Sequence, residues 1–172
     1  MIDLKDYIRD VPDFPQAGIL FRDITPLLQD AAAFAHALDL ITEHVRTLRA
    51  DAVAGIESRG FLFGAPVAAR LGLPFVPIRK PGKLPAAHMS VEYSLEYGNN
   101  QLDIHSDALE RGQRAAIIDD LLATGGTAKA AAKLVELVGG EVAGIVFLIE
   151  LAALRGRADL GAYDVTSFVV YE

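Results

Sequence analysis

The sequence predicts an α/β fold built on a mainly parallel, twisted sheet that is flanked by helices. Segments whose apolar residues recur at helical spacing alternate with short apolar segments typical of strands. These strand segments are almost continuously apolar, as expected for strands that helices cover on both faces. No repeat, low-complexity stretch or charged linker interrupts the 172 residues, of which 52% are apolar. We therefore expect one domain, residues 1–172, with a substantial core.

The first predicted helix begins after Asp30. Its apolar residues recur at helical spacing and are Phe34, Ala37, Leu38, Ile41, Val45 and Leu48. Residues 52–56 form a short apolar strand, and residues 60–71 form a second helix that Gly72 ends. Residues 74–78 form the next strand, whose two prolines favour an edge or strand-end position.

The alternation of helices and strands is interrupted after residue 78. Residues 79–90 contain two prolines, one glycine and three cationic residues, which predicts a long mobile loop. Residues 93–97 and 101–104 flank the expected turn of a hairpin at 98–100. The remaining predicted elements are a strand over 115–118, a helix over 127–138 ended by Gly139 and Gly140, and strands over 142–149 and 165–171.

Charge and composition limit the classes of ligand and location. With 16 Lys and Arg against 23 Asp and Glu, the net charge of −7 argues against charge-driven binding to nucleic acid or anionic membranes. The absence of cysteine excludes disulfides, thiolate metal sites and a cysteine nucleophile. Residues 1–6 lack the pattern of a signal peptide, and the longest apolar run, 142–149, is too short to cross a bilayer. We expect a cytoplasmic protein.

The strongest functional signal lies over 117–127, where a buried strand runs through two carboxylates and a small-residue loop into a helix. Glycine in the loop lets backbone N–H groups approach an anion, and the N-terminus of the helix adds positive potential. The two carboxylates are suited to accept hydrogen bonds from ribose hydroxyls or to lie near a hydrated Mg²⁺. The segment therefore predicts a sugar-phosphate site. Its candidate contacts are Asp119, Asp120, Ala123, Thr124, Gly125, Gly126 and Thr127.

A capped helix with a glycine-rich connector is the alternative for this segment, which is neither a Walker loop nor a dinucleotide-binding fingerprint. Residues 57–60 are a second candidate anion site, because they follow a buried strand and open a helix. Arg59 in this loop could instead be a solvated surface residue. Three cationic residues of the predicted mobile loop could add positive charge for binding an anion. Alternatively, they form an exposed basic loop without a ligand. They are Arg79, Lys80 and Lys83.

The segment over 117–127 resembles the motif with which type I phosphoribosyltransferases bind phosphoribosyl pyrophosphate (PRPP). Further segments resemble, in the same order along the chain, those of the adenine phosphoribosyltransferase branch of this family. They are 14–15, Gly18, 21–24, 57–61, 79–85 and 93–98. The resemblance implies the type I phosphoribosyltransferase fold, with a small hood from residues 1–30 and a flexible lid loop and hairpin over 79–103. It also implies purine salvage, in which the phosphoribosyl group of PRPP passes to adenine and gives AMP and pyrophosphate.

The resemblance further implies roles for individual residues in the transfer reaction. The pyrophosphate contacts would be Glu57, Ser58, Arg59, Arg79, Lys80 and Lys83. Arg59 and Lys83 would act in catalysis together with Glu96, the acid/base residue at N7 of the base. The loop at 57–58 often contains a cis peptide bond in this family. Taken without the family, Glu96 would be a surface residue of a hairpin.

The resemblance also assigns the base pocket and the lid. Adenine would contact Leu20, Phe21, Arg22 and Leu151, the first and third of these through main-chain groups, and Tyr97 would help to gate the site. Phe21 and Leu151 are otherwise ordinary core residues. Departures from the family pattern at 86–89 and 99–101 concern the dynamics of the loop more than the chemistry.

Mg²⁺ is the cofactor that the family implies, bound chiefly by oxygens of the substrate and water, with no dedicated protein site. The four histidines show no convincing ligand spacing. They are His36, His44, His88 and His105. The family implies a homodimer, whereas neither nucleic acid nor membrane is expected as a partner. Two alternatives stay open: a xanthine, hypoxanthine or guanine phosphoribosyltransferase, and a non-catalytic PRPP-sensing regulator on the same fold.

Overall fold

The computed structural model describes residues 2–95 and 98–172. Contacts along the described chain group it into two compact units, Met1–Leu40 and Ile41–Glu172. The larger second unit contains the predicted sheet and most of the candidate site.

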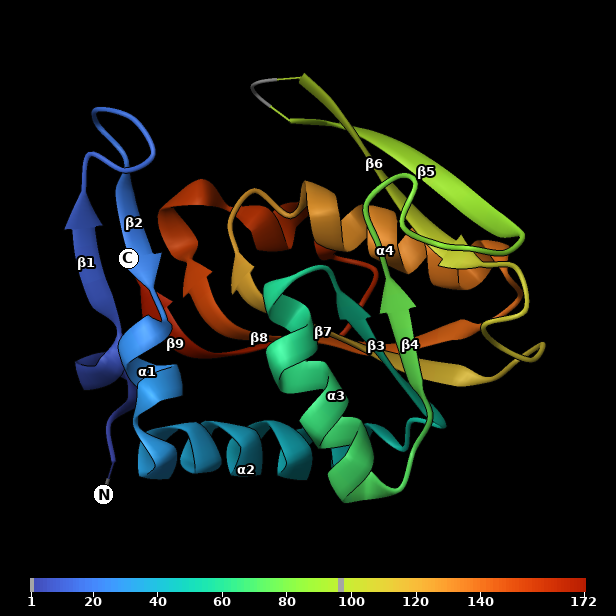
Figure 1. Ribbon diagram of the computed structural model, residues 1–172, viewed down its shortest axis with the longest axis horizontal. Helices are drawn as coiled ribbons and strands as arrows, with labels where there is room; N and C mark the ends of the chain where they lie inside the picture. Colours follow the sequence, from blue (N-terminus) through green and yellow to red (C-terminus); the bar gives the residue numbers. More distant parts are fainter. Residues whose placement is uncertain (1, 96–97) are drawn as a thin grey trace. The chain divides into compact units, whose positions relative to one another are not determined.

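Within the described residues, the second unit is built on a five-stranded sheet with the order β4-β3-β7-β8-β9. Every neighbouring pair in this sheet is parallel, which confirms the predicted fold class. The strands are β3 (Ala52–Ile56), β4 (Phe75–Ile78), β7 (Arg114–Leu122), β8 (Glu141–Leu151) and β9 (Val165–Tyr171). β4 lies at one edge, as its prolines predicted. Figure 1 shows β3 and β7 side by side near the middle of the sheet.

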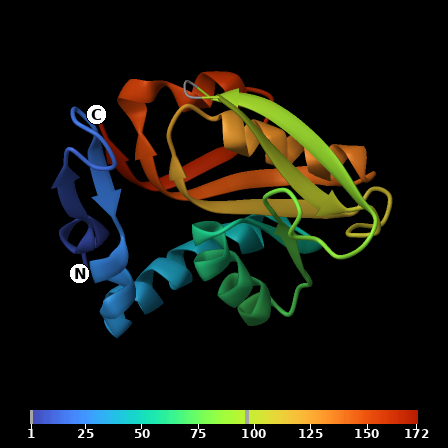
Figure 2. The same cartoon turned by 45° about the horizontal axis from the view of Figure 1, so that its top comes forward.

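Helices cover both faces of this sheet, α3 (Arg59–Leu71) on one side and α4 (Gly126–Leu137) on the other (Figure 2). Successive side chains of β3 point to opposite faces of the sheet, so this strand packs against the helices on both sides. Ala52, Ala54 and Ile56 join the buried cluster that contains the apolar face of α4. That face is largely alanine, which lets the helix approach the sheet closely. Its buried residues are Ala128, Ala130, Ala131, Ala132, Leu134 and Val135.

The hairpin formed by β5 (His88–Leu95) and β6 (Gly98–His105) is longer than predicted. Its antiparallel pairing runs from His88 opposite His105 to Leu95 opposite Gly98, so residues 98–100 belong to β6 instead of a turn. The reason is burial, because apolar residues of both strands join the cluster around α4, and Figure 2 shows the hairpin over that helix. The irregular segment that precedes the hairpin is correspondingly shorter and covers 79–87.

The first unit contains η1 (Leu4–Tyr7), the antiparallel strands β1 (Arg9–Pro12) and β2 (Leu20–Asp23), and α1 (Thr25–Gln29). The apolar pattern did not predict these strands, because the hairpin is held by cross-strand ion pairs. Arg9 pairs with Asp23 at 2.6 Å, and Arg22 pairs with Asp10. Short strands that ion pairs stabilise do not need alternating apolar residues, so an apolar pattern does not reveal them in the sequence.

Helix α2 (Ala31–Leu48) begins in the first unit and ends in the second. Asp30 starts it as predicted: its Oδ1 accepts hydrogen bonds from the N–H groups of Ala32 (3.0 Å) and Ala33 (2.9 Å). The apolar positions predicted for this helix are buried, apart from the partly exposed Phe34. Gly72 ends α3 in the left-handed conformation, with φ of 67°, again as predicted.

The connection from β8 to β9 contains two short 3₁₀ helices that the sequence pattern did not predict, η2 (Ala152–Leu154) and η3 (Gly156–Leu160). No helix in the described part of the chain combines the length and apolar character that crossing a membrane requires.

Candidate active site

The candidate site lies where β3 and β7 end. These strands are hydrogen-bonded neighbours, with Gly55 opposite Ile118, so the chain leaves the sheet at the same edge from both. The loop after β3 covers 57–58, and the turn after β7 covers 123–125. Ligands of parallel α/β sheets characteristically bind beyond this edge.

Asp119 and Asp120 lie within β7, which continues four residues past the strand end that its apolar pattern predicted at 118. Asp119 Oδ1 accepts a hydrogen bond from the N–H of Asp120 at 2.9 Å. Burial and the charge of Asp120 raise the pKa of Asp119 well above its usual value. Burial also raises the pKa of Asp120, which is 3% exposed, although the neighbouring Arg59 favours its ionised form. The pair therefore resists carrying two negative charges and can accept hydrogen bonds from a neutral, hydroxyl-rich ligand.

The turn over 123–125 and the start of α4 line a cleft of about 250 Å³. Gly125 has φ of 88°, a left-handed conformation that few other residues adopt, and it caps the helix. The first N–H groups of α4 have no intrahelical acceptors and, with the helix dipole, favour an anion at this end. Thr127 Oγ1 lies 3.3 Å from the hydroxyl of Tyr93, which links this helix start to the hairpin. The turn and the start of α4 thus offer hydrogen-bond donors of the kind that a phosphate group binds.

The loop after β3 approaches the carboxylates directly. Arg59 Nε lies 2.8 Å from Asp120 Oδ2, and the peptide bond between Glu57 and Ser58 is cis. Gly60 explains how α3 comes so close, because a Cβ atom there would lie 2.7 Å from the carbonyl oxygen of Ile118. A second cleft, of about 300 Å³, is lined by both this loop and the carboxylates. Its lining residues are Glu57, Ser58, Arg59, Lys80, Asp119 and Asp120.

Glu57 is bonded to the segment that follows β4. Its carboxylate accepts from the N–H of Lys80 at 3.0 Å and from Arg79 Nε at 3.2 Å. Arg79 Nη1 in turn donates to the carbonyl oxygen of Lys83 at 3.1 Å. The hydrogen bond from Lys80 and the Arg79 guanidinium lower the pKa of Glu57, so it is ionised at neutral pH. The structure thus pairs Glu57 with Arg79, whereas Lys80 and Lys83 are exposed.

Lys80 also lines a third cleft, of about 410 Å³, together with residues of the hairpin. The other lining residues are Pro81, Glu92, Tyr93, Asn100 and Gln101. This cleft adjoins the cationic loop.

The residues expected around the base lie in both units. Leu20, Phe21 and Arg22 are in β2 of the first unit, where the ring of Phe21 packs edge-on against Phe14 at 5.1 Å. Leu151 is the last residue of β8 in the second unit. The predicted acid/base residue Glu96 and the predicted gating residue Tyr97 lie outside the described residues.

Sequence reasoning placed Gly60 in the candidate anion loop over 57–60 but predicted no packing role for it, and it gave no role to Tyr93, although both residues lie at the candidate site. A glycine inside the first turn of a helix was the available signal for Gly60, since glycine is unfavourable there without a packing reason. No comparable signal marked Tyr93. Among residues 2–95 and 98–172, no cluster of three or more histidines and carboxylates is arranged to hold a metal ion.

Comparison with known proteins identifies the architecture. The family model of the phosphoribosyl transferase domain matches residues 24–171. The chain belongs to the phosphoribosyltransferase family. An adenine phosphoribosyltransferase of Carboxydothermus hydrogenoformans is 56% identical over 170 residues, which cover 99% of this chain and 100% of that protein.

Solved phosphoribosyltransferase structures have the same fold. The crystal structure of adenine phosphoribosyltransferase from Thermoanaerobacter pseudethanolicus is 54% identical, with a TM-score of 0.95 over 98% of each chain. That of the Saccharomyces cerevisiae enzyme, complexed with an imino-altritol 1,6-bisphosphate and adenine, is 37% identical. Its TM-score is 0.89, and the match covers 96% of this chain and 95% of that one. The predicted fold and family resemblance are therefore confirmed.

Proposed function

We propose that this phosphoribosyltransferase transfers the phosphoribosyl group of PRPP to adenine, which makes it a pentosyltransferase of purine salvage. The observation that carries the proposal is that the loops 57–60 and 123–127 line two clefts, both of which the carboxylates of Asp119 and Asp120 also line. PRPP has an anionic group for each loop, and a ribose separates its 5′-phosphate from its pyrophosphate. The yeast relative crystallised with a bisphosphate and adenine supports the same assignment.

The turn over 123–127 holds the 5′-phosphate through its backbone N–H groups and through the hydroxyls of Thr124 and Thr127. Asp119 and Asp120 accept hydrogen bonds from the ribose hydroxyls. Bond cleavage at C1 of the ribose develops positive charge on the ring, as in glycoside cleavage. The neighbouring carboxylate charge stabilises that positive charge.

The loop over 57–60 and the cationic segment hold the pyrophosphate. Arg59, Lys80 and Lys83 place positive charge where negative charge develops on the departing group. Glu57 acts by holding Arg79 and the backbone of Lys80 in position. Closure of the segment over the site would exclude water, which otherwise hydrolyses PRPP.

Adenine contacts Leu20, Phe21, Arg22 and Leu151, and Glu96 exchanges a proton at N7 while N9 attacks C1. Tyr97 gates the site. These assignments rest on the resemblance of 21–24 and 93–98 to the adenine branch of the family. Backbone acceptors opposite the exocyclic amine would select adenine over bases that carry a carbonyl there.

Mg²⁺ fits this site through the substrate. Carboxylate oxygens are the donor type that this ion takes, and Asp119 and Asp120 border both clefts, where they can bond to its water ligands. When bound with PRPP, Mg²⁺ would neutralise charge on the pyrophosphate oxygens. Cytoplasmic location and homodimer formation also belong to the proposal.

The proposal is tested by incubating the purified protein with PRPP, Mg²⁺ and one purine at a time. AMP formed from adenine, with little product from hypoxanthine, guanine or xanthine, is the expected result. Product from another base alone would refute the adenine assignment. PRPP binding without any product would favour the non-catalytic regulator.

A further inference from the structure

The connection between β8 and β9 packs directly against the phosphate-binding turn. A Cβ atom on Gly125 would lie 2.5 Å from the carbonyl oxygen of Gly156. A Cβ atom on Gly156 would overlap the carbonyl oxygen of Ala123 and would lie 3.0 Å from the backbone nitrogen of Gly125. The two backbones therefore touch without a side chain between them, and Gly156 is buried.

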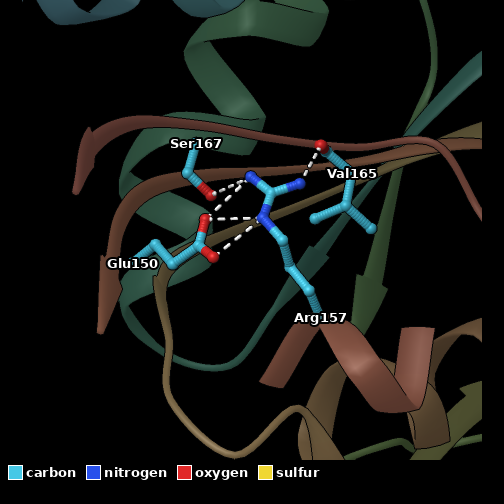
Figure 3. Close-up of polar contacts among 4 residues, drawn as sticks. All are labelled: Glu150, Arg157, Val165 and Ser167. Atoms are coloured by element: carbon cyan, nitrogen blue, oxygen red, sulfur yellow. Dashed lines mark hydrogen bonds and ion pairs between the residues drawn. The ribbon is translucent and has the colours of Figure 1, made fainter. Parts of the chain in front are cut away.

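The residue that follows this contact is fixed by hydrogen bonds to two strands (Figure 3). Arg157 Nε donates to both carboxylate oxygens of Glu150, at 2.8 and 2.9 Å, and Nη2 donates to Glu150 Oε2 at 2.7 Å. The guanidinium also donates to the carbonyl oxygen of Val165 at 2.6 Å and to Ser167 Oγ at 3.3 Å. Arg157 thereby joins the end of β8 to β9.

The ion pair between Arg157 and Glu150 is strong because Glu150 is only 6% exposed. The hydrogen bonds from Arg157 lower its pKa, so the ion pair is fully charged at neutral pH. Arg155, in the left-handed conformation with φ of 53°, turns the chain so that Gly156 faces the phosphate turn. Leu160, at the other end of η3, is fully buried in the core cluster. The segment over 156–160 is therefore anchored at both ends.

We propose that Gly156 and Arg157 are positioning residues for the 5′-phosphate site. Gly156 supports the turn over 123–125 from behind, and Arg157 fixes Gly156 to the sheet. Backbone N–H donors of a phosphate site must be placed accurately, since small displacements from the productive geometry are costly. The inference rests on the proposed function, because it takes the 5′-phosphate as the ligand of this turn.

The test substitutes Gly156→Ala and measures binding of ribose 5-phosphate and of pyrophosphate by calorimetry. The backbone of Gly156 lies outside the left-handed region, so the added methyl group acts through its contacts with Leu122, Ala123 and Gly125. Ribose 5-phosphate should bind about ten- to a hundredfold more weakly, and the KM for PRPP should rise. Pyrophosphate, held by 57–60, should bind as in the wild type. A merely structural role for Gly156 would weaken both ligands.

Gly161→Ala is the matched control, because it lies at the end of the same 3₁₀ helix with φ of −60°. Its added Cβ would meet its nearest described neighbour, the carbonyl oxygen of Ala158, at 3.8 Å. This variant should bind both ligands normally. If Gly156→Ala does not fold, Arg157→Lys replaces it, since lysine keeps the charge but loses the fork of donors to Glu150.

Unchanged binding of ribose 5-phosphate to a folded Gly156→Ala, or to Arg157→Lys in its place, would overturn the inference. So would equal weakening of ribose 5-phosphate and pyrophosphate. Failure of the proposed function has a different signature, namely a wild-type protein that binds ribose 5-phosphate but forms no AMP from adenine.

Discussion

Arg59 and Asp120 form an ion pair of 2.8 Å that joins the start of α3 to the end of β7. The guanidinium belongs to the proposed pyrophosphate loop, and the carboxylate belongs to the proposed ribose site. Asp120 is almost completely buried, whereas the side chain of Arg59 is 37% exposed. The two subsites are therefore coupled electrostatically, and a substitution of this carboxylate should change ligand binding at both.

Asp120→Asn should weaken PRPP binding about tenfold, because a charge-assisted hydrogen bond to a ribose hydroxyl becomes a neutral one. Pyrophosphate alone should bind at least as tightly as to the wild type, since a negative charge beside its loop is removed. Calorimetry with each ligand measures both effects. Unchanged PRPP affinity would refute the assignment of Asp120 to the ribose.

Asp119→Asn should stabilise the protein at neutral pH while weakening PRPP binding. The pKa of Asp119 is raised in the folded protein, so between its ordinary value, about 3.9, and the folded value the native state binds more protons than the unfolded state. Stability of the wild type therefore falls as pH rises through this window. The advantage of the variant should be absent below about pH 4 and should grow as pH rises through this window. Urea unfolding at several pH values checks this, and a constant difference would contradict it.

Glu150→Gln should destabilise the protein by about 1–2 kcal/mol at pH 7, because the bonds to Arg157 lose their charge, although the half-exposed guanidinium can still be solvated. The pKa of Glu150 is lowered in the folded protein, so its contribution is present above the ordinary glutamate value, about 4.3. That contribution is lost as pH falls through the folded pKa. Thermal unfolding should show that the stabilities of the wild type and the variant converge in acid. A stability difference that widens in acid would contradict the predicted direction.

Glu96→Gln should lower kcat about a hundredfold with little change in PRPP affinity, since the amide cannot exchange a proton with the base. Steady-state kinetics and PRPP binding separate these two effects. Glu110→Gln, an exposed change on another loop, is the control and should leave both values unaltered. Equal turnover in the two variants would remove Glu96 from the acid/base role.

The fold and the glycine-containing turn between β7 and α4 could be predicted because their signals are local. The apolar runs of β3 and β8, the cap at Asp30 and the glycines after Asp119 and Asp120 each lie within a few consecutive residues. The extent of β7 was underestimated because backbone pairing with β8 continues past the point where apolar residues give way to the two carboxylates.

Contacts between distant segments could not be predicted in this way. Glu57 bonds to Arg79 and the backbone of Lys80 across more than twenty residues. Gly125 and Gly156 meet through main-chain atoms, so no side chain records their contact in the sequence. The hairpin of the first unit depends on charge pairs such as Arg9 with Asp23, which an apolar pattern does not detect.

The pairing of β3 with β7 also limits the size of any ligand that fills both loops. Neighbouring strands are spaced about 4.8 Å apart, and β7 continues from its last pairing with β3, at Ile118, to Leu122 before its loop begins. The geometry of these two strands therefore sets the distance between the two anionic groups that the loops can bind. Backbone hydrogen bonds fix the register of this strand pair, from Ala52 opposite Ala115 to Gly55 opposite Ile118. Side-chain substitutions can change the affinity for either group, but selection for substrate length should change only through insertions, deletions or a shift in strand register.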